Sequence, residues 1–158
     1  MNCIIIDDEP LARAEMRSLI HETSKIDILG EFSNAPSALE FLKDNDADLI
    51  FLDIEMPLVT GLEFAEMLPK KSLIIFTTAY AQYALKSYEL EAVDYLLKPI
   101  DPQRLEKAID KAVLYTELFV QGYRKEHGRV KYKRLFYLSK QSGDFIKSVF
   151  QRLNLLKD

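Results

Sequence analysis

The chain has 158 residues, 48% of them hydrophobic, and a formal net charge of −4. This length and composition suffice for one domain with a buried core, and a single cysteine, Cys3, excludes an intrachain disulfide. The N-terminus lacks the basic region and long apolar stretch of a secretory signal, and no later segment approaches the roughly 20 apolar residues that span a bilayer. We therefore expect a cytoplasmic protein that does not associate with membranes.

The charge is distributed unevenly along the chain. Residues 1–123 contain 11 Lys and Arg against 22 Asp and Glu, a net charge of −11, whereas residues 124–158 contain 10 against 3, a net charge of +7. We expect residues 1–123 to form the domain and residues 124–158 to be a basic C-terminal extension, either a linker or a fragment of an output domain. Such an extension can bind nucleic acid, or it can be a solvated surface that compensates the acidic body.

Short apolar runs recur along the acidic part. Those at residues 3–6, 49–52 and 73–76 are nearly continuous and rich in branched residues, as in strands covered on both faces. The segment 26–32 alternates between apolar and polar residues, and the segment 92–98 includes polar residues. These two segments are expected at the edges of the sheet.

Helical patterns separate the strands. Helices are expected at residues 10–22, 35–43, 62–68 and 81–88, and a long fifth helix from residue 102 to Gly122 or Gly128. Pro10 and the pair Asp101-Pro102 suit helix starts, and Ser33 or Asn34 can cap the second helix. Five strands alternating with five helices predict an α/β fold with a doubly wound parallel sheet. With the two polar strands at its edges, the sheet has the flavodoxin-like order 2-1-3-4-5.

Polar residues directly follow four of the five apolar runs. They are Asp7, Asp8, Asp53, Thr77, Thr78 and Lys98. Because the carboxyl ends of parallel strands meet at one edge of a sheet, three carboxylates, a hydroxyl and an ammonium are expected near the switch point between strands one and three. Taken singly, each residue has a plainer interpretation as a helix cap, a loop residue or a surface lysine.

Clustered carboxylates favour a divalent cation and a reactive oxygen. Carboxylates within about 4–6 Å repel one another, and a cation removes the conflict. Mg²⁺ fits best because it takes one or two carboxylates and keeps several waters. Asp53 would then attack phosphorus and become an aspartyl phosphate, with Lys98 and Thr78 contacting the phosphoryl oxygens.

Four motifs in this order resemble the receiver domain of two-component response regulators. They are Ile6-Asp7-Asp8-Glu9-Pro10, Leu52-Asp53-Ile54-Glu55-Met56-Pro57 with Gly61, Thr77-Thr78-Ala79-Tyr80, and Asp94-Tyr95-Leu96-Leu97-Lys98-Pro99. The resemblance covers about residues 1–120 and implies a receiver domain over residues 1–123. The stretch from Thr78 to Pro99 is similar in particular to LytTR-type receivers, whose second domain binds DNA, but residues 124–158 are too few for such a domain.

The resemblance implies a role for each acidic residue. Asp53 would be the phosphoacceptor. Mg²⁺ would be bound by the side chains of Asp8 and Asp53 with Asp7 assisting, and by the backbone carbonyl of Glu55. We also hypothesise that Glu55 and Tyr80, two positions beyond Asp53 and Thr78, control water access to the acyl phosphate.

The resemblance also implies a switch. Thr78, which directly precedes a small residue as in the family motif, would follow the phosphoryl group, Lys98 would be its counter-ion, and the Lys98-Pro99 bond would be cis. Movement of Thr78 would let the ring of Tyr95 turn inward and change the surface formed by helix four, strand five and helix five, through which we expect a homodimer.

A sensor histidine kinase is the expected phosphoryl donor, docking at residues 11–19 and the loop after Lys98. The chain would catalyse only its own phosphorylation and dephosphorylation, and so is not expected to be an enzyme in the ordinary sense. One alternative is a phosphatase of the haloacid-dehalogenase kind, although the nucleophile of those proteins lies in an Asp-x-Asp motif at the first strand. Another is a degenerate receiver that acts only as a protein-interaction module.

Overall fold

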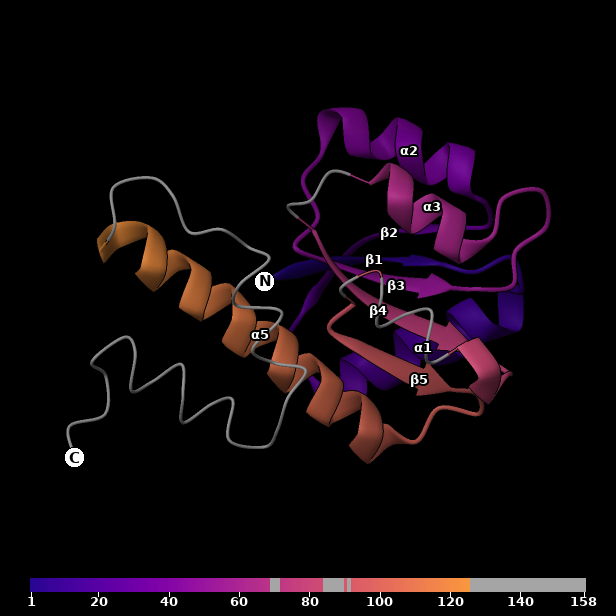
Figure 1. Ribbon diagram of the computed structural model, residues 1–158. Helices are drawn as coiled ribbons and strands as arrows, with labels where there is room; N and C mark the ends of the chain where they lie inside the picture. The colour runs from indigo at the N-terminus through magenta and orange to yellow at the C-terminus, as the bar shows by residue number, and fades with distance from the viewer. Residues whose placement is uncertain (69–71, 84–89, 91, 126–158) are drawn as a thin grey trace. The chain divides into compact units, whose positions relative to one another are not determined.

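The structure, a computed structural model, describes residues 1–68, 72–83, 90 and 92–125, with the backbone alone described over residues 118–125. Five parallel strands form one sheet in the order β2-β1-β3-β4-β5 (Figure 1). The strands are β1 Asn2–Ile6, β2 Asp27–Phe32, β3 Leu49–Asp53, β4 Leu73–Thr78 and β5 Asp94–Leu97. The predicted strand order is confirmed, and the two strands with polar residues in their pattern are its edges.

Helices connect these strands. They are α1 Pro10–Thr23, α2 Ala35–Asp44, α3 Gly61–Met67 and α5 Pro102–Lys125, with a short 3-10 helix, η1, at Ala81–Tyr83. Figure 1 shows α1 on one face of the sheet and α2 and α3 on the other, as the doubly wound fold requires. The predicted helix 81–88 begins within η1, and the rest of it lies outside the described residues.

The chain divides within α5 into two units, Met1–Leu114 and Tyr115–Asp158. The sheet and all the candidate site residues lie in the first unit. The predicted domain boundary at residue 123 falls inside α5. Residues 126–158, which make up nearly all of the basic extension, lie outside the described residues, so the predicted role of that extension stays a prediction.

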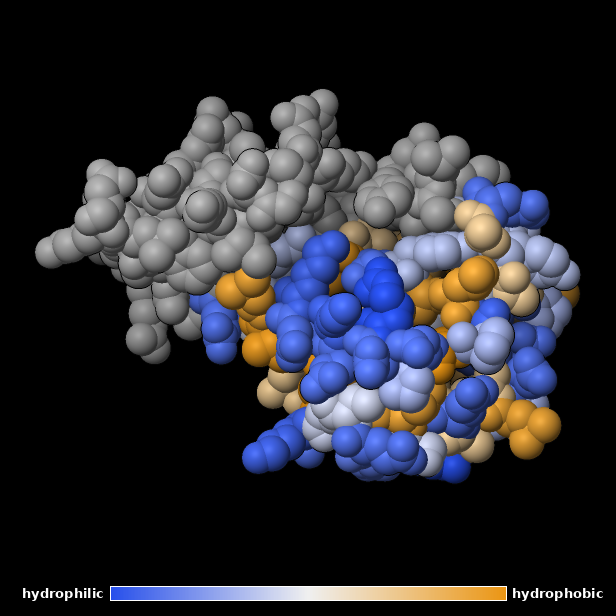
Figure 2. All heavy atoms as spheres, turned by 90° about the horizontal axis from the view of Figure 1, so that it is seen from below, coloured by the Kyte–Doolittle hydropathy of each residue, from blue (hydrophilic) through white to orange (hydrophobic). Residues whose placement is uncertain are grey.

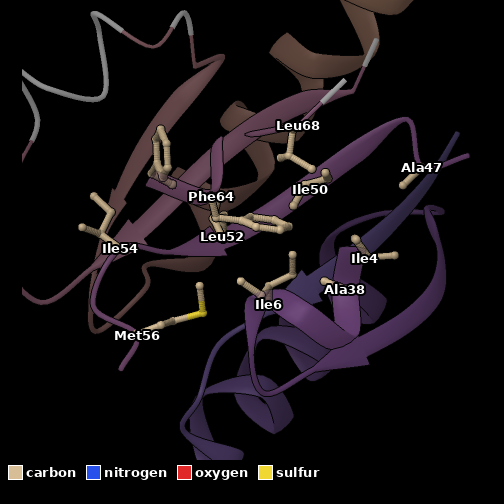
Figure 3. Packing of buried hydrophobic residues seen from close by; sticks show 12 residues of the cluster. Ile4, Ile6, Ala38, Ala47, Ile50, Leu52, Ile54, Met56, Phe64 and Leu68 are labelled. Carbon is tan, nitrogen blue, oxygen red and sulfur yellow. The ribbon is translucent and has the colours of Figure 1, made fainter. Parts of the chain in front are cut away.

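One hydrophobic core joins β1, β3 and β4 to α2 and α3. Because side chains alternate along a strand, Ile4 and Ile6 of β1 point to the same face as Ile50 and Leu52 of β3. Figure 3 shows these side chains gathered with Ala38 of α2 and with Phe64 and Leu68 at α3. The large members are fully buried, and each contributes about 1.5–3 kcal/mol to folding.

The opposite face of the sheet is covered as well. Cys3, Ile5, Leu49, Phe51 and Ile75 alternate with the residues of the first core and are buried. Buried residues of α1 and of the first part of α5 supply further apolar groups; they are Met16, Ile20, Leu105, Ala108, Ile109 and Ala112. The near-continuous apolar strands are thus explained by burial on both faces. Burial also raises the pKa of the Cys3 thiol to about 12, so this cysteine is a small core residue.

Side chains define the starts of three helices. Asn34 Oδ1 accepts a hydrogen bond of 2.9 Å from the amide of Ser37, which selects Asn34 over Ser33 as the cap of α2. Asp101 Oδ1 accepts one of 2.8 Å from the amide of Arg104 at the start of α5. At α3, Thr60 and Glu63 form a reciprocal capping box that the sequence interpretation missed, although Thr-x-x-Glu is its usual signature.

Hydrophilic residues cover most of the described part of the face shown in Figure 2, with hydrophobic residues between them in small groups. Within the described residues, no helix combines the length and apolar character that a membrane span requires.

Candidate functional site

Three carboxylates meet at the carboxyl edge of the sheet. Asp7 and Asp8 follow β1, and Asp53 ends β3, the neighbouring strand. One carboxylate oxygen of each lies within 4.8 Å of those of the other two. Asp7 and Asp53 are only 4% and 3% exposed, while Asp8 is exposed. The predicted meeting of these acids is confirmed, and its geometry suits a small divalent cation with water among its ligands.

Lys98, which follows β5, completes the cluster. Its Nζ donates hydrogen bonds to Oδ2 of Asp7 at 2.7 Å and to Oδ1 of Asp53 at 3.1 Å. The Lys98-Pro99 peptide bond is cis, as predicted. Burial alone would lower the pKa of Lys98, but its hydrogen bonds and the charges of Asp7 and Asp53 raise that pKa above its usual value. The ammonium is therefore firmly protonated.

The environment of Asp53 disfavours its charged form. Burial and then the charge of Asp7 raise the pKa of Asp53 to about 6, with a smaller contribution from Glu55, although Lys98 acts in the opposite direction. The positive charge of Lys98 thus only partly compensates the negative charges of the carboxylates around Asp53. A bound cation would supply the charge that is lacking.

Backbone amides fix the orientation of both buried carboxylates. The amide of Glu9 donates to Oδ1 of Asp7 at 2.9 Å, and the amide of Glu55 donates to Oδ2 of Asp53 at 3.2 Å. In each case the donor lies two residues after the aspartate, the pattern of an Asx turn. Nη1 of Arg13 also donates to the backbone carbonyl of Asp7 at 2.6 Å, a contact the sequence interpretation missed.

Gly61 lets the start of α3 pass close to the end of β3. Its amide donates to the carbonyl of Ile54 at 2.9 Å. A Cβ atom at this position would lie 2.0 Å from the backbone oxygen of Asp53. The absence of a side chain is therefore necessary for the backbone around Asp53 to keep this path.

Thr78 is buried, with 0% exposure, and its hydroxyl contacts Glu55. Oγ1 of Thr78 donates to Oε2 of Glu55 at 3.1 Å and accepts from the amide of Tyr80 at 3.1 Å. The neighbouring Thr77 instead lines a cavity beside α1. The structure thus places the hydroxyl of Thr78, and not that of Thr77, at the loop that follows Asp53.

Tyr95 on β5 connects to the same loop. Its hydroxyl donates a hydrogen bond to the backbone carbonyl of Tyr80, and its ring packs, partly buried, against the core. Burial and then the charge of Glu55 raise the pKa of Tyr95. Next to it, Asp94 accepts hydrogen bonds of 2.9 and 2.5 Å from the guanidinium of Arg104 on α5.

A cavity of about 380 Å³ opens beside the cluster, between α1 and the loop after β5. Its lining includes Asp7 and Lys98 from the cluster, Leu11 and Met16 from α1, and Ile100 after the cis bond. Leu11 is 77% exposed, so a large apolar side chain faces solvent at the rim of the site.

Known proteins are similar to the part of the chain that forms the sheet. The family model of the response regulator receiver domain matches residues 3–110. The transcriptional regulatory protein BtsR of Escherichia coli is 47% identical over 108 residues, which are 67% of this chain and 45% of BtsR. An uncharacterized response regulatory protein of Vibrio vulnificus is 43% identical over 113 residues, or 70% of this chain and 47% of that protein. The chain spans about half the length of these curated relatives.

Solved structures show the same fold. The response regulatory domain of mrkE from Klebsiella pneumoniae has a TM-score of 0.69 and 38% identity, over 74% of this chain and 98% of that one. The REC domain of the response regulator AraT from Geobacillus stearothermophilus has a TM-score of 0.66 and 32% identity, over 73% of this chain and 95% of that one. By its sequence and its fold, the chain therefore belongs to the family of response regulator receiver domains of two-component systems.

Proposed function

We propose that the domain is a phosphorylation-dependent switch in which Asp53 accepts a phosphoryl group. The observation that carries this proposal is the position of Asp53, buried at the end of β3 between two other carboxylates and 3.1 Å from the ammonium of Lys98. A carboxylate nucleophile needs this combination of nearby positive charge, fixed orientation and restricted water.

In the transfer step, a carboxylate oxygen of Asp53 attacks phosphorus and forms the new P–O bond. The bond from phosphorus to the donor breaks, and the leaving group keeps the electron pair. Lys98 stabilises the phosphoryl oxygens by its charge, and the hydroxyl of Thr78 donates a hydrogen bond to one of them once its hydrogen bond to Glu55 is broken. Water later attacks phosphorus, which releases inorganic phosphate and restores the carboxylate.

The residues present fit a Mg²⁺ ion. The donor set is made of carboxylates, which are hard oxygen ligands, and Lys98 alone only partly compensates their charges. Asp8 is exposed, so water could supply the remaining ligands. The side chains of Asp8 and Asp53 and the backbone carbonyl of Glu55 would hold the ion, with Asp7 assisting. When bound, Mg²⁺ supplies positive charge to the transferring phosphoryl group.

The phosphoryl donor is proposed to be a sensor histidine kinase that docks on α1 and the loop after Lys98. The exposed side chain of Leu11 and the apolar lining of the adjacent cavity support this placement, because the surface leads directly to Asp7 and Lys98. Replacing Leu11 with Ser should slow transfer from a phosphorylated kinase but leave phosphorylation by acetyl phosphate unchanged.

The output proposed for the switch is dimerisation through the helix predicted at residues 81–88, β5 and α5, followed by DNA binding by a further domain. The relative BtsR is named a transcriptional regulatory protein, and only about half of its length is represented in this chain. Because residues 78–99 resemble the corresponding stretch of LytTR-type receivers, we propose that the chain belongs to the LytTR-type branch. On this proposal it catalyses no reaction beyond the gain and loss of its own phosphoryl group.

Incubation with acetyl phosphate and Mg²⁺, followed by intact mass measurement, tests the proposal. The wild type should gain one phosphoryl group that is lost on standing, and Asp53→Asn should gain none. Sustained release of phosphate from p-nitrophenyl phosphate would instead support a phosphatase, and absence of any adduct would support a degenerate receiver.

A further inference from the structure

Glu55 connects the phosphoacceptor to the threonine of the switch. Its amide donates to Oδ2 of Asp53 at 3.2 Å, while its carboxylate oxygen Oε2 accepts from the hydroxyl of Thr78 at 3.1 Å and from the amide of Ala79 at 3.4 Å. Glu55 and Thr78 are 23 positions apart and lie at the ends of neighbouring strands. The side chain of Glu55 thus joins the loop after β3 to the end of β4.

The bond to Glu55 occupies the only proton of the Thr78 hydroxyl. A threonine hydroxyl donates one hydrogen bond, and here Oε2 of Glu55 accepts it while the amide of Tyr80 donates to the oxygen. Thr78 is buried, so water does not readily replace Glu55 as the acceptor of this hydrogen bond. Thr78 cannot donate to a phosphoryl oxygen on Asp53 until it releases Glu55, and the two arrangements are mutually exclusive.

The hydrogen-bond chain continues to the surface at β5. The amide of Tyr80 donates to Thr78, and the carbonyl of Tyr80 accepts from the hydroxyl of Tyr95. Any displacement of Thr78 therefore also displaces the backbone of Tyr80, which is hydrogen-bonded to Tyr95. The order of contacts is Glu55, Thr78, Tyr80, Tyr95.

We propose that Glu55 is a positioning residue that holds Thr78 away from the phosphoryl position in the unphosphorylated protein, and that loss of this hydrogen bond couples Asp53 to Tyr95. This inference rests on the proposed function. It assigns to the Glu55 side chain a task separate from that of its backbone carbonyl.

Charge supplies the reason for release. A carboxylate of charge −1 becomes an acyl phosphate of roughly −1.5 to −2 near neutral pH. The negative charge of Glu55 already contributes to the raised pKa of Asp53, so the two side chains interact electrostatically before phosphorylation. Additional negative charge on Asp53 repels the Glu55 carboxylate, and the phosphoryl oxygens offer Thr78 a competing charged acceptor.

The test uses NMR of ring-labelled tyrosine, with the Tyr95 signal assigned by Tyr95→Phe. Beryllium fluoride with Mg²⁺, a phosphoryl mimic, defines the Tyr95 signal of the switched state in the wild type. Without any mimic, Glu55→Ala should shift the population toward that signal by about tenfold, the effect of one hydrogen bond to a charged group. Glu55→Gln should shift it less, because the amide oxygen still accepts from Thr78.

Two controls isolate the contact. Glu66→Ala removes an equal charge from an exposed position that lines the groove next to Glu55, and it should leave Tyr95 unchanged. In a Thr78→Ala background the contact is already absent, so Glu55→Ala should cause no further shift.

Two outcomes would overturn the inference. One is an unchanged Tyr95 signal in Glu55→Ala, and the other is that Glu55→Ala shifts Tyr95 as much in the Thr78→Ala background as in the wild type. If Glu55→Ala does not fold, Glu55→Met, which has no oxygen to accept from Thr78, takes its place, and an unshifted Tyr95 in that variant overturns the inference.

The outcomes also separate this inference from the proposed function. If the wild type takes no phosphoryl group from acetyl phosphate, the proposed function fails. If the wild type is phosphorylated at Asp53 while Tyr95 is insensitive to Glu55, the function stands and only the role of Glu55 fails.

Discussion

Nζ of Lys98 lies 3.1 Å from Oδ1 of Asp53, although the two residues are 45 positions apart in sequence. The same ammonium lies 2.7 Å from Oδ2 of Asp7. A single cation thus faces two buried carboxylates, and its removal leaves them to repel each other and any phosphoryl group that approaches.

Replacement of Lys98 by Ala should therefore slow phosphorylation by acetyl phosphate by about 10²-fold, the usual effect of losing one charge-stabilising group in a transfer reaction. The rate is measured from the growth of the phosphorylated mass over time at saturating Mg²⁺. Lys43→Ala is the matched control, because Lys43 is an exposed lysine on α2 paired with Glu40, and its rate should equal that of the wild type. Equal rates in all three proteins would contradict the role of Lys98.

The raised pKa of Asp53 predicts how stability changes with pH in metal-free buffer. The pKa rises from 3.8 to about 6 on folding, so protonated Asp53 favours the folded state, and this stability is present below pH 3.8 and lost as the pH rises through about 6. Asp53→Asn, which carries no charge, escapes this loss. Its advantage over the wild type in free energy of unfolding should grow between about pH 4 and 6 and reach on the order of 3 kcal/mol.

Urea unfolding at a series of pH values with EDTA measures this difference. Only the difference between the two proteins is informative, because other groups titrate in both. An advantage that stays constant from pH 4 to 8 would show that the charge of Asp53 costs the fold nothing.

Magnesium should stabilise the folded protein through the three carboxylates. At a concentration one hundred times the dissociation constant the gain is about 2.7 kcal/mol, and it appears as an increase in the melting temperature. Asp8→Asn should lose most of this gain because the exposed Asp8 completes the donor set. Glu22→Gln, an equal charge change at the exposed end of α1, should keep it. Equal responses from both variants would show that Mg²⁺ binds elsewhere.

Gly61 should tolerate no side chain. In Gly61→Ala the new Cβ would lie 2.0 Å from the backbone oxygen of Asp53, so β3 and α3 must separate, at a cost of about 3 kcal/mol or more. Gly30→Ala is the control, because its closest contact is the ring of Phe32 at 2.9 Å, a side chain that can move. Chemical unfolding of both variants should show the larger loss at Gly61, and similar losses would contradict the close approach.

Much of the fold could be predicted because local patterns and burial agree. The apolar runs of β1, β3 and β4 are strands buried on both faces, and β2 and β5, whose patterns include polar residues, are edges. The capping box of Thr60 with Glu63 was missed but could have been predicted, since its Thr-x-x-Glu signature is visible in the sequence. The backbone conformation of Leu58, with a φ of 71°, could not be predicted, because nothing in the sequence indicates that a leucine adopts the left-handed region.

The candidate site could be predicted as far as backbone topology determines it. Asp7, Asp53 and Lys98 meet because they end neighbouring or nearby parallel strands. The contact between the side chains of Glu55 and Thr78 could not be predicted, since it depends on the rotamer of a long side chain and on the path of two loops. The same holds for Arg13, whose guanidinium reaches back six positions to the carbonyl of Asp7.

The most direct test of the central claim identifies the residue that carries phosphorus. The protein is treated with acetyl phosphate and Mg²⁺, then with borohydride, which reduces an acyl phosphate to the corresponding alcohol, and digested for peptide mass analysis. Phosphorylation of Asp53 predicts homoserine at position 53 and unchanged aspartates at positions 7 and 8. Reduction at Asp7 or Asp8, or a protein that gains phosphate with no reducible residue at position 53, would contradict it.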